Sequence, residues 1–278
     1  MNWKQTLFWS FSAAAIFYYF LLFGVFVFVG QEEMQLFIPE WWYIREFLFQ
    51  PGGFCAVAGQ WIIQYYRQPM SAVVLHTVLL VGCGFMVYRI LRCFSDKTYL
   101  LFLSLLPVLY LVKMSIHGEY LVDGTVGVVL MLLALSVSLK VRRAGSIAGY
   151  GIASTLFLCG LTGLLSVCYA FLYTLLALLR YKTSRQRLAA AACLIPALFI
   201  YLFSGWLGIP VPLSDGWMPE AYLEIQRLPH YYMYRVWTFF TLSIVGVALF
   251  ARFVPVIGEK SKWMDRVALV VCLITALV

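Results

Sequence analysis

Charge is what this sequence has least of. Charged residues make up 12% of the 278 residues and hydrophobic residues 63%, whereas about a quarter of an ordinary soluble domain is charged. A soluble domain of this length leaves roughly a quarter of its chain surface exposed to water, so it could not hide so much apolar surface. The composition therefore excludes an ordinary cytosolic enzyme, a disordered chain and a disulfide-stapled secreted module. It indicates a protein solvated by lipid.

The common motifs of cofactor and metal chemistry are also missing. None of the seven cysteines forms a C-x-x-C pair, and the chain has no G-x-x-x-x-G-K-[ST], H-E-x-x-H, G-x-S-x-G or dinucleotide-binding glycine pattern. We therefore expect no cofactor and no metal site, and neither ATP-driven transport nor zinc proteolysis by those routes is supported. The net charge of +8 suits the orientation of membrane helices better than nucleic-acid binding, so no nucleic-acid partner is expected.

Long runs without charge predict an all-α, multi-pass membrane protein. The first run covers residues 5–31, which is long enough for a helix to cross a bilayer core of about 30 Å. The run 144–179 is too long for one crossing, and Gly160 to Gly163 in its middle can form a turn, so we expect two short helices there. The eight predicted spans are 5–31, 68–88, 98–112, 124–139, 146–159, 164–179, 188–214 and 236–251.

The basic residues predict the orientation of these spans. With the N-terminus in the cytoplasm, 15 Lys and Arg residues fall on the inner side and five on the outer side, as the positive-inside rule requires. Nine of the twelve acidic residues then face outward. We therefore expect a bacterial inner-membrane protein with a cytoplasmic N-terminus. After Arg266 only twelve apolar residues remain, so the single transmembrane domain 1–278 is expected to end inside a truncated ninth helix.

Two long outer loops are expected, at 31–67 and 208–235. In the first, Pro39 suits the start of a helix, and the aromatic and aliphatic residues after it give that helix an apolar face. Pro51-Gly52-Gly53 interrupts it, and a second helix from Phe54 to Tyr66 is expected. The first loop should therefore carry amphipathic helices that lie at the membrane interface.

Three strings in the first part of the chain resemble a family of uncharacterised polytopic membrane proteins from Bacteroidetes-type bacteria. They are E-x-x-Q-L-F from Glu32, Q-P-G-G-F from Gln50 and Q-W-I-I-Q-Y-Y-R-Q-P from Gln60. The resemblance covers roughly residues 15–130 and implies a multi-pass organisation in longer chains with more spans and a soluble C-terminal region. It implies no activity, since that family has none established.

The layout as a whole is similar to the C-type glycosyltransferase fold. Those enzymes keep an acid, usually Asp, in the first outer loop just after helix one, and they transfer a sugar from a lipid-phosphate carrier. Here Glu32 or Glu33 stands at the place of that acid, and Glu119 or Asp123 at the place of a second. The resemblance implies a polyprenyl-phosphate carrier as the lipid partner.

Such a transferase needs a carboxylate that takes a proton from the acceptor hydroxyl, and donors that bind the carrier phosphate. The candidate catalytic residues are Glu32, Glu33, Glu119 and Asp123. The alternative is that these are solvated acids at helix ends. The candidate substrate-binding residues are Arg45, Arg67, His117, Arg227, His230 and Arg235, and all of them except His117 could bind the phosphate. The alternative for the arginines is that they hold helix ends at the interface, and His76, inside the second span, is expected to be neutral and bonded to a neighbouring helix.

Three functions remain open from the sequence alone. The first is a lipid-linked-sugar transferase at the outer face, and the second is a non-catalytic membrane scaffold that binds another protein through its outer loops. The third is a transporter. An ion-coupled transporter has few candidate residues here, because no predicted span carries paired charges.

Overall fold

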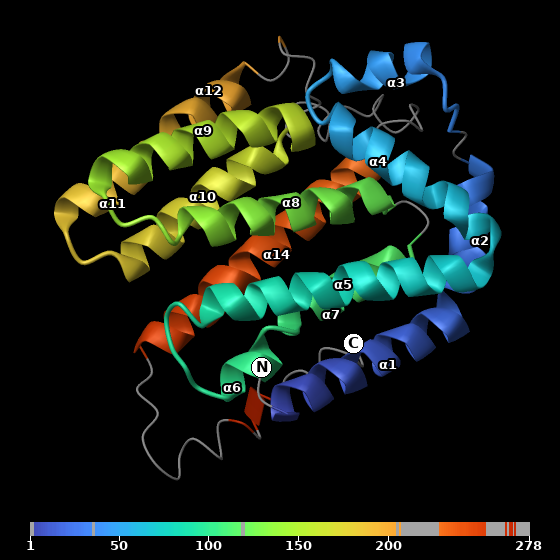
Figure 1. Cartoon of the computed structure of the whole chain (residues 1–278), viewed down its shortest axis with the longest axis horizontal. Helices are drawn as coiled ribbons and strands as arrows, with labels where there is room; N and C mark the ends of the chain where they lie inside the picture. Colours follow the sequence, from blue (N-terminus) through green and yellow to red (C-terminus); the bar gives the residue numbers. More distant parts are fainter. Residues whose placement is uncertain are drawn as a thin grey trace.

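The computed structural model describes residues 3–34, 37–117, 120–203, 206, 228–253, 265, 267–268 and 270. All the elements in these stretches are helices (Figure 1), which confirms the all-α prediction for the described part of the chain. The elements in chain order are α1 (Trp3–Phe23), α2 (Val25–Met34), α3 (Trp41–Leu48), α4 (Gly53–Ile63), η1 (Gln64–Arg67), α5 (Pro69–Leu91), α6 (Tyr99–Leu103), α7 (Leu106–Ser115), α8 (Val122–Ser138), α9 (Ala144–Thr162), α10 (Leu165–Arg180), α11 (Ser184–Ala191), α12 (Leu194–Leu202) and α14 (Leu228–Phe253).

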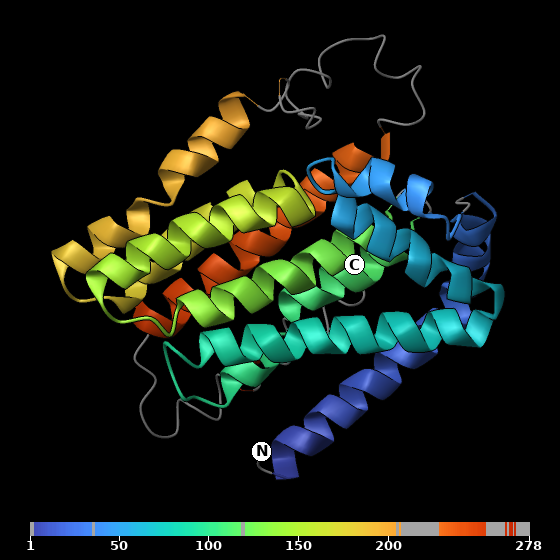
Figure 2. The same ribbon diagram turned by 45° about the horizontal axis from the view of Figure 1, so that its top comes forward.

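The long helices form one bundle whose members run roughly along a common direction. Helices α5 and α8 lie side by side at its centre, and α14 packs against α7 and α10 (Figure 1). Helix α1 flanks the bundle next to α5, and α12 flanks it on the other side, next to α9 and α10 (Figure 2). Fully buried side chains such as Leu80, Leu132 and Tyr169 make up its core.

The prediction of eight full-length spans is only partly supported. In the described stretches four helical segments are long and apolar enough to cross a membrane: Trp3–Phe23, Pro69–Leu91, Ala144–Thr162 and Ser184–Leu202. The other apolar helices are shorter: Tyr99–Ser115, Val122–Ser138, Leu165–Arg180 and Val236–Arg252. The ninth, truncated span expected at 267–278 lies mostly outside the described residues.

Local breaks explain why some of the helices differ from their predicted extents. The first predicted span divides at Gly24, where an added Cβ would lie 2.9 Å from the Phe28 ring. The third divides at Ser104 and Leu105, just before Pro107, because a proline inside a helix lacks an amide hydrogen. The predicted turn between α9 and α10 is confirmed, and Gly163 there has a φ of 61°, a conformation that favours glycine.

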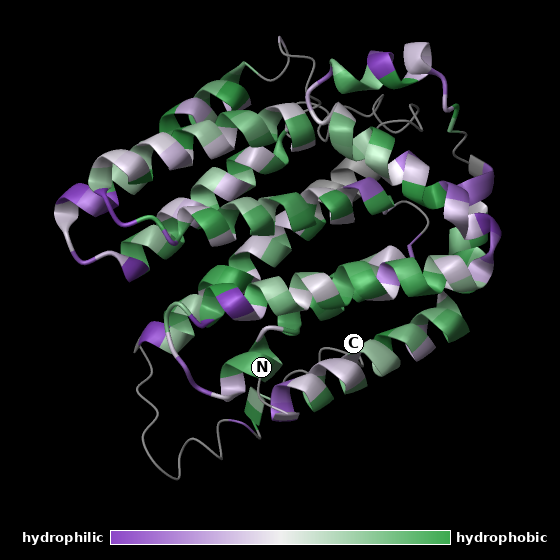
Figure 3. Cartoon of the chain, in the orientation of Figure 1, coloured by the Kyte–Doolittle hydropathy of each residue, from purple (hydrophilic) through white to green (hydrophobic). Residues whose placement is uncertain are grey.

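Large apolar side chains cover much of the outside of the bundle. Phe11 and Leu22 of α1, Phe26 of α2, and Ile195 and Leu202 of α12 are all more than half exposed, and green hydrophobic stretches alternate with paler ones along α1 and α12 (Figure 3). Soluble monomers seldom expose apolar patches of such extent. The surface and the four long apolar helices are compatible with a membrane protein.

The two helices of the first long loop behave differently from each other. Helix α3 has no buried residue and is strongly amphipathic, as expected for a helix at an interface. Helix α4 was also predicted to lie at the interface, but it packs against α8 and α9 and buries Cys55, Gly59 and Ile63. Its small side chains explain the difference, because they let two helix backbones approach closely.

Candidate functional site

The candidate site lies at the end of the bundle where α2 ends, η1 connects α4 to α5, and α8 begins. We call it the groove end and define it as residues 31–33, 59–75, 117 and 120–125. In Figure 1 this end lies on the right, around α2, η1 and the first turns of α5 and α8. The tight contacts of η1 with α2, α4 and α5 bring these segments together.

A buried polar contact joins the end of α2 to the segment before α8. Gln31 is 2% exposed, and its Nε2 donates a hydrogen bond to the backbone oxygen of Tyr120 at 2.9 Å. The Tyr120 hydroxyl lies 3.1 Å from the Thr125 hydroxyl. Glu32 and Glu33 follow Gln31 directly, so this contact fixes the turn of α2 that carries them. Glu32 is half-buried and Glu33 is exposed.

Asp123 lies in the first turn of α8, underneath α4. Its Oδ1 accepts a hydrogen bond from the Gly124 amide at 2.7 Å, and the residue is half-buried. A Cβ added to Gly59 would lie only 2.7 Å from the Asp123 Cβ and 2.9 Å from the Asp123 amide nitrogen. Glycine is therefore required at position 59 for α4 to cross α8 at this point. Asp123 is thus a predicted acid that the structure packs against a second helix.

Tyr66 and His76 form a second buried polar contact, between η1 and α5. The Tyr66 hydroxyl lies 2.5 Å from His76 Nε2, and both side chains are almost fully buried. The Phe28 ring stacks on the imidazole with 4.3 Å between ring centroids. The expectation that His76 bonds to a neighbouring element is confirmed. Tyr66, which the sequence places among the aromatic residues of the interface, is instead a core residue.

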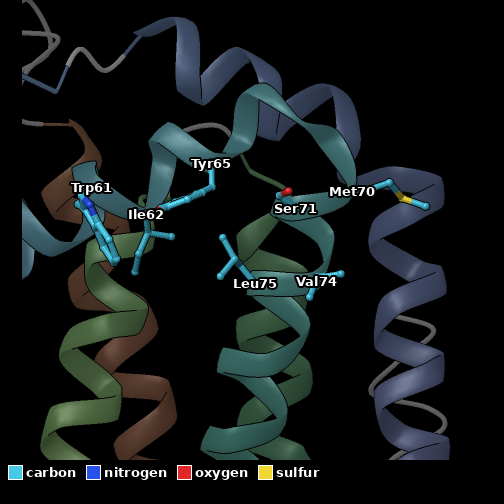
Figure 4. Close-up of a pocket in the computed structure, with 7 residues that line it drawn as sticks. All are labelled: Trp61, Ile62, Tyr65, Met70, Ser71, Val74 and Leu75. Atoms are coloured by element: carbon cyan, nitrogen blue, oxygen red, sulfur yellow. The ribbon is translucent and has the colours of Figure 1, made fainter.

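An apolar groove opens beside this contact. Its volume is about 460 Å³, and its walls come from α4 and η1 on one side and from α5 on the other (Figure 4). Several of its side chains, among them Trp61, Tyr65 and Val74, are about half exposed, so the groove is open to the outside of the bundle. The lining residues are Trp61, Ile62, Tyr65, Met70, Ser71, Val74 and Leu75.

The cations predicted for this end are exposed. Arg67 ends η1, directly before the first turn of α5, and its side chain is exposed. Arg45 on α3 is exposed, and its guanidinium carbon lies 5.7 Å from the centre of the Phe49 ring. Neither forms an ion pair with a carboxylate of the described residues. Both guanidinium groups are therefore available to bind an anionic ligand.

The remaining predicted residues contribute less. His117 is exposed, and its backbone accepts a hydrogen bond from the Tyr120 amide at 3.0 Å. Glu119 and Arg227 lie outside the described residues. His230 and Arg235 belong to α14, and only their backbone is described. Within the described ranges no group of three His, Cys, Asp or Glu side chains could hold a metal ion.

Sequence reasoning overlooked the residues that shape this end. Gln31, Gly59 and the Tyr66–His76 pair organise it, yet His76 was the one residue of these four that was singled out, and then only as a histidine bonded to a neighbouring helix. One signal was available for Gln31, which is the last residue of the charge-free run 5–31 and directly precedes Glu32, so it stands where a helix leaves the apolar region. The contact of Tyr66 with His76 left no signal beyond the presence of an ionisable side chain within an apolar run.

Comparison with known proteins identifies a family but no activity. No curated protein and no solved structure matches the chain. The model of a family of unknown function matches residues 1–275. The chain therefore belongs to that family, DUF6057.

Proposed function

We propose that the protein is a multi-pass enzyme of the bacterial inner membrane that transfers a sugar from a lipid-phosphate carrier at its groove end. The N-terminus lies in the cytoplasm in this proposal, and all eight apolar helical segments cross the membrane, the shorter ones where the bilayer thins or where other helices shield their ends. The exposed apolar side chains of α1 and α12 support membrane insertion.

The observation that carries the proposal is the apolar groove. Its opening toward the outside of the bundle would let a lipid tail enter sideways from the bilayer. Aromatic and aliphatic side chains such as Trp61 and Leu75 line it and suit an isoprenoid chain, whose burial is favoured by the hydrophobic effect. A carrier seated in this way would bring its phosphate toward Arg67, which follows the groove residue Tyr65 closely in η1.

The reaction requires one base and one cation. A carboxylate takes the proton of the acceptor hydroxyl, whose oxygen then attacks the anomeric carbon of the sugar. The bond between that carbon and the phosphate oxygen breaks, and the carrier leaves as its phosphate, whose negative charge Arg67 would stabilise. The candidate bases are Glu32, Glu33 and Asp123, because the Gln31–Tyr120 contact ties the segments that carry them together.

The experiment measures transfer by the purified protein in neutral detergent. A polyprenyl-phosphate sugar is supplied as donor and a set of sugar and lipid alcohols as acceptors, and release of the polyprenyl phosphate together with the glycosylated acceptor is followed by mass spectrometry. We expect Glu33→Gln or Asp123→Asn to lower the rate by about 100-fold or more, as removal of a catalytic base does. Glu46→Gln on the exposed helix α3 is the matched control and should leave the rate unchanged.

A different result would support the second function. If the donor neither reacts nor binds, while α3 and the groove retain their structure, the proposal of a transferase is wrong. The protein would then be better described as a membrane scaffold whose groove end binds another protein. Tryptophan fluorescence of the wild type compared with Trp61→Phe separates these outcomes, because a lipid that enters the groove must change the environment of the Trp61 indole even without turnover.

A further inference from the structure

A strongly basic surface lies at the end of the bundle opposite the groove end. We call it the basic platform. It consists of the loop between α8 and α9 and the segment from Arg180 to Arg187, which includes the first turn of α11. The stretch from Gly124 to Ser214 contains no acidic residue at all. Figure 3 shows hydrophilic residues gathered around α11 and the adjoining loops. The seven cations of the platform are Lys140, Arg142, Arg143, Arg180, Lys182, Arg185 and Arg187.

Two hydrogen bonds join the two segments into one surface, and a third holds the second segment together. The Tyr181 hydroxyl donates to the backbone oxygen of Val141 at 2.6 Å, and Gln186 Nε2 donates to the backbone oxygen of Arg142 at 2.6 Å. Arg187 Nε donates to the backbone oxygen of Tyr181 at 2.8 Å. Since α9 also packs against α11, cations that are some 40 residues apart in the sequence are held close together.

In the described part of the protein no carboxylate forms an ion pair with any of these seven cations. The one ion pair there joins Arg92 to Asp96, at 3.0 Å, outside the platform. Arg180 Nη1 is buried and has no hydrogen-bond partner. Helices α9 and α11 both begin at the platform, and neither N-cap side chain bonds to the first turn. A ligand that carries negative charge would relieve the mutual repulsion of these cations and would meet the free amides of the two helix starts.

Apolar side chains beside the cations indicate which kind of anion this is. Leu188 is 75% exposed and lies one helical turn from Arg185 on α11, so both share one face. Ile195, on the helix that follows, is 72% exposed. A ligand that fits both features has a phosphate and a hydrocarbon chain.

We propose that the basic platform is a binding site for the head group of an anionic phospholipid. The guanidinium groups of Arg142, Arg143 and Arg185 bind its phosphate, because planar guanidinium groups match phosphate oxygens in pairs. The acyl chains lie along the exposed apolar faces of α11 and α12. Such basic sites between membrane helices on the cytoplasmic side are where anionic lipids bind.

The test titrates the full chain in neutral detergent with phosphatidylglycerol and counts bound lipid by native mass spectrometry. We expect the triple substitution Arg142→Gln, Arg143→Gln and Arg185→Gln to weaken binding by more than about tenfold, since each nearby cation contributes roughly fivefold. The matched control removes three charges outside the platform, with Arg89→Gln, Arg92→Gln and Lys97→Gln. It should change the affinity by less than about twofold.

Further variants and ligands keep the outcomes distinct. The corresponding triple change to lysine keeps the charge but not the paired guanidinium–phosphate bonds, so it should weaken binding less than the glutamine change does, which guards against a glutamine variant that does not fold. Equal losses in the platform and control variants, or equal binding of phosphatidylcholine, would overturn the proposal. Tighter binding of a single-stranded oligonucleotide would overturn it as well. The lipid-binding site rests on the proposed membrane insertion but not on the proposed sugar transfer. Because the test measures no turnover, the lipid site and the sugar transfer can fail separately.

Discussion

Gly52 and Gly163 touch each other although they belong to distant parts of the sequence. They are the only described residues with positive φ, 85° and 61°, and a Cβ added to Gly52 would lie 3.3 Å from the Gly163 amide nitrogen. The Gly52 amide donates a hydrogen bond to the backbone oxygen of Gly160 at 3.1 Å. The turn before α4 is thereby docked on the turn between α9 and α10.

Alanine at either glycine should destabilise the protein. Gly52→Ala and Gly163→Ala force a side chain into a left-handed conformation, which costs roughly 1–2 kcal/mol each, and the Gly52 change also crowds the contact between the turns. Thermal unfolding in detergent measures the loss. Gly149→Ala is the control, because nothing lies within 4 Å of a Cβ at that position and alanine favours the interior of α9. A control that is destabilised as much as Gly52→Ala would contradict the argument.

Alanine at Gly59 should separate α4 from the first turn of α8. The new Cβ would meet the Asp123 backbone within 3.0 Å, and backbone cannot move aside as a flexible side chain does. Overpacking of this kind costs roughly 1–3 kcal/mol. We expect lower thermal stability and weaker binding of a polyprenyl phosphate, whereas Gly82→Ala on α5, which has open space, should leave both unchanged. Unaltered lipid binding by Gly59→Ala would show that this crossing does not shape the groove end.

Hydropathy and charge were enough to predict much of the fold. Charge-free runs correspond to α5, α8, α9 and α10 to within a few residues, and the glycine-containing turn between α9 and α10 was foreseen. Apolarity alone could not show where a helix breaks within a run, as at Gly24. It also could not show that α4 packs into the bundle, because the periodicity of a short helix does not reveal what covers it.

The candidate site was harder to predict. Carboxylates stand out in an apolar sequence, so Glu32, Glu33 and Asp123 could be selected, and the structure ties their segments together through Gln31 and Tyr120. The groove depends on how η1 turns between α4 and α5. That turn depends in part on a contact between Tyr66 and His76, a tertiary contact with no pattern in the sequence.

The side chains of Tyr66 and His76 should be energetically coupled to each other. Tyr66→Phe leaves His76 Nε2 buried without this partner, and His76→Phe does the same to the Tyr66 hydroxyl, so each should cost about 1–2 kcal/mol. The double variant should cost less than the sum of the two, and a cycle of unfolding measurements gives the difference. Tyr65→Phe is the matched control, since Tyr65 is about half exposed. Strictly additive losses would mean that the two side chains do not stabilise each other.

Filling the groove should block lipid binding without harming the fold. Val74 lines the groove and is 48% exposed, so Val74→Trp places an indole in the space that a lipid tail would occupy. We expect at least about tenfold weaker binding of a polyprenyl phosphate, measured by native mass spectrometry. Val78→Trp, one turn further along α5 at an exposed position outside the groove, is the control. If both variants bind the lipid normally, the tail lies elsewhere on the protein.

Two cysteines can test the orientation that the proposed function requires. Cys93 is exposed and follows α5 close to the basic end, whereas Cys159 is half-buried near the other end of α9. In a chain whose other cysteines are replaced by serine or alanine, a maleimide that cannot cross membranes should label Cys93 only in inverted vesicles. In a chain that carries Cys159 alone, the same reagent should label that thiol from outside intact cells. Labelling should be slower than that of Cys93 in inverted vesicles, because the Cys159 thiol is partly covered. Reversed labelling would place the groove end in the cytoplasm, and a carrier at the outer face could then no longer be the substrate.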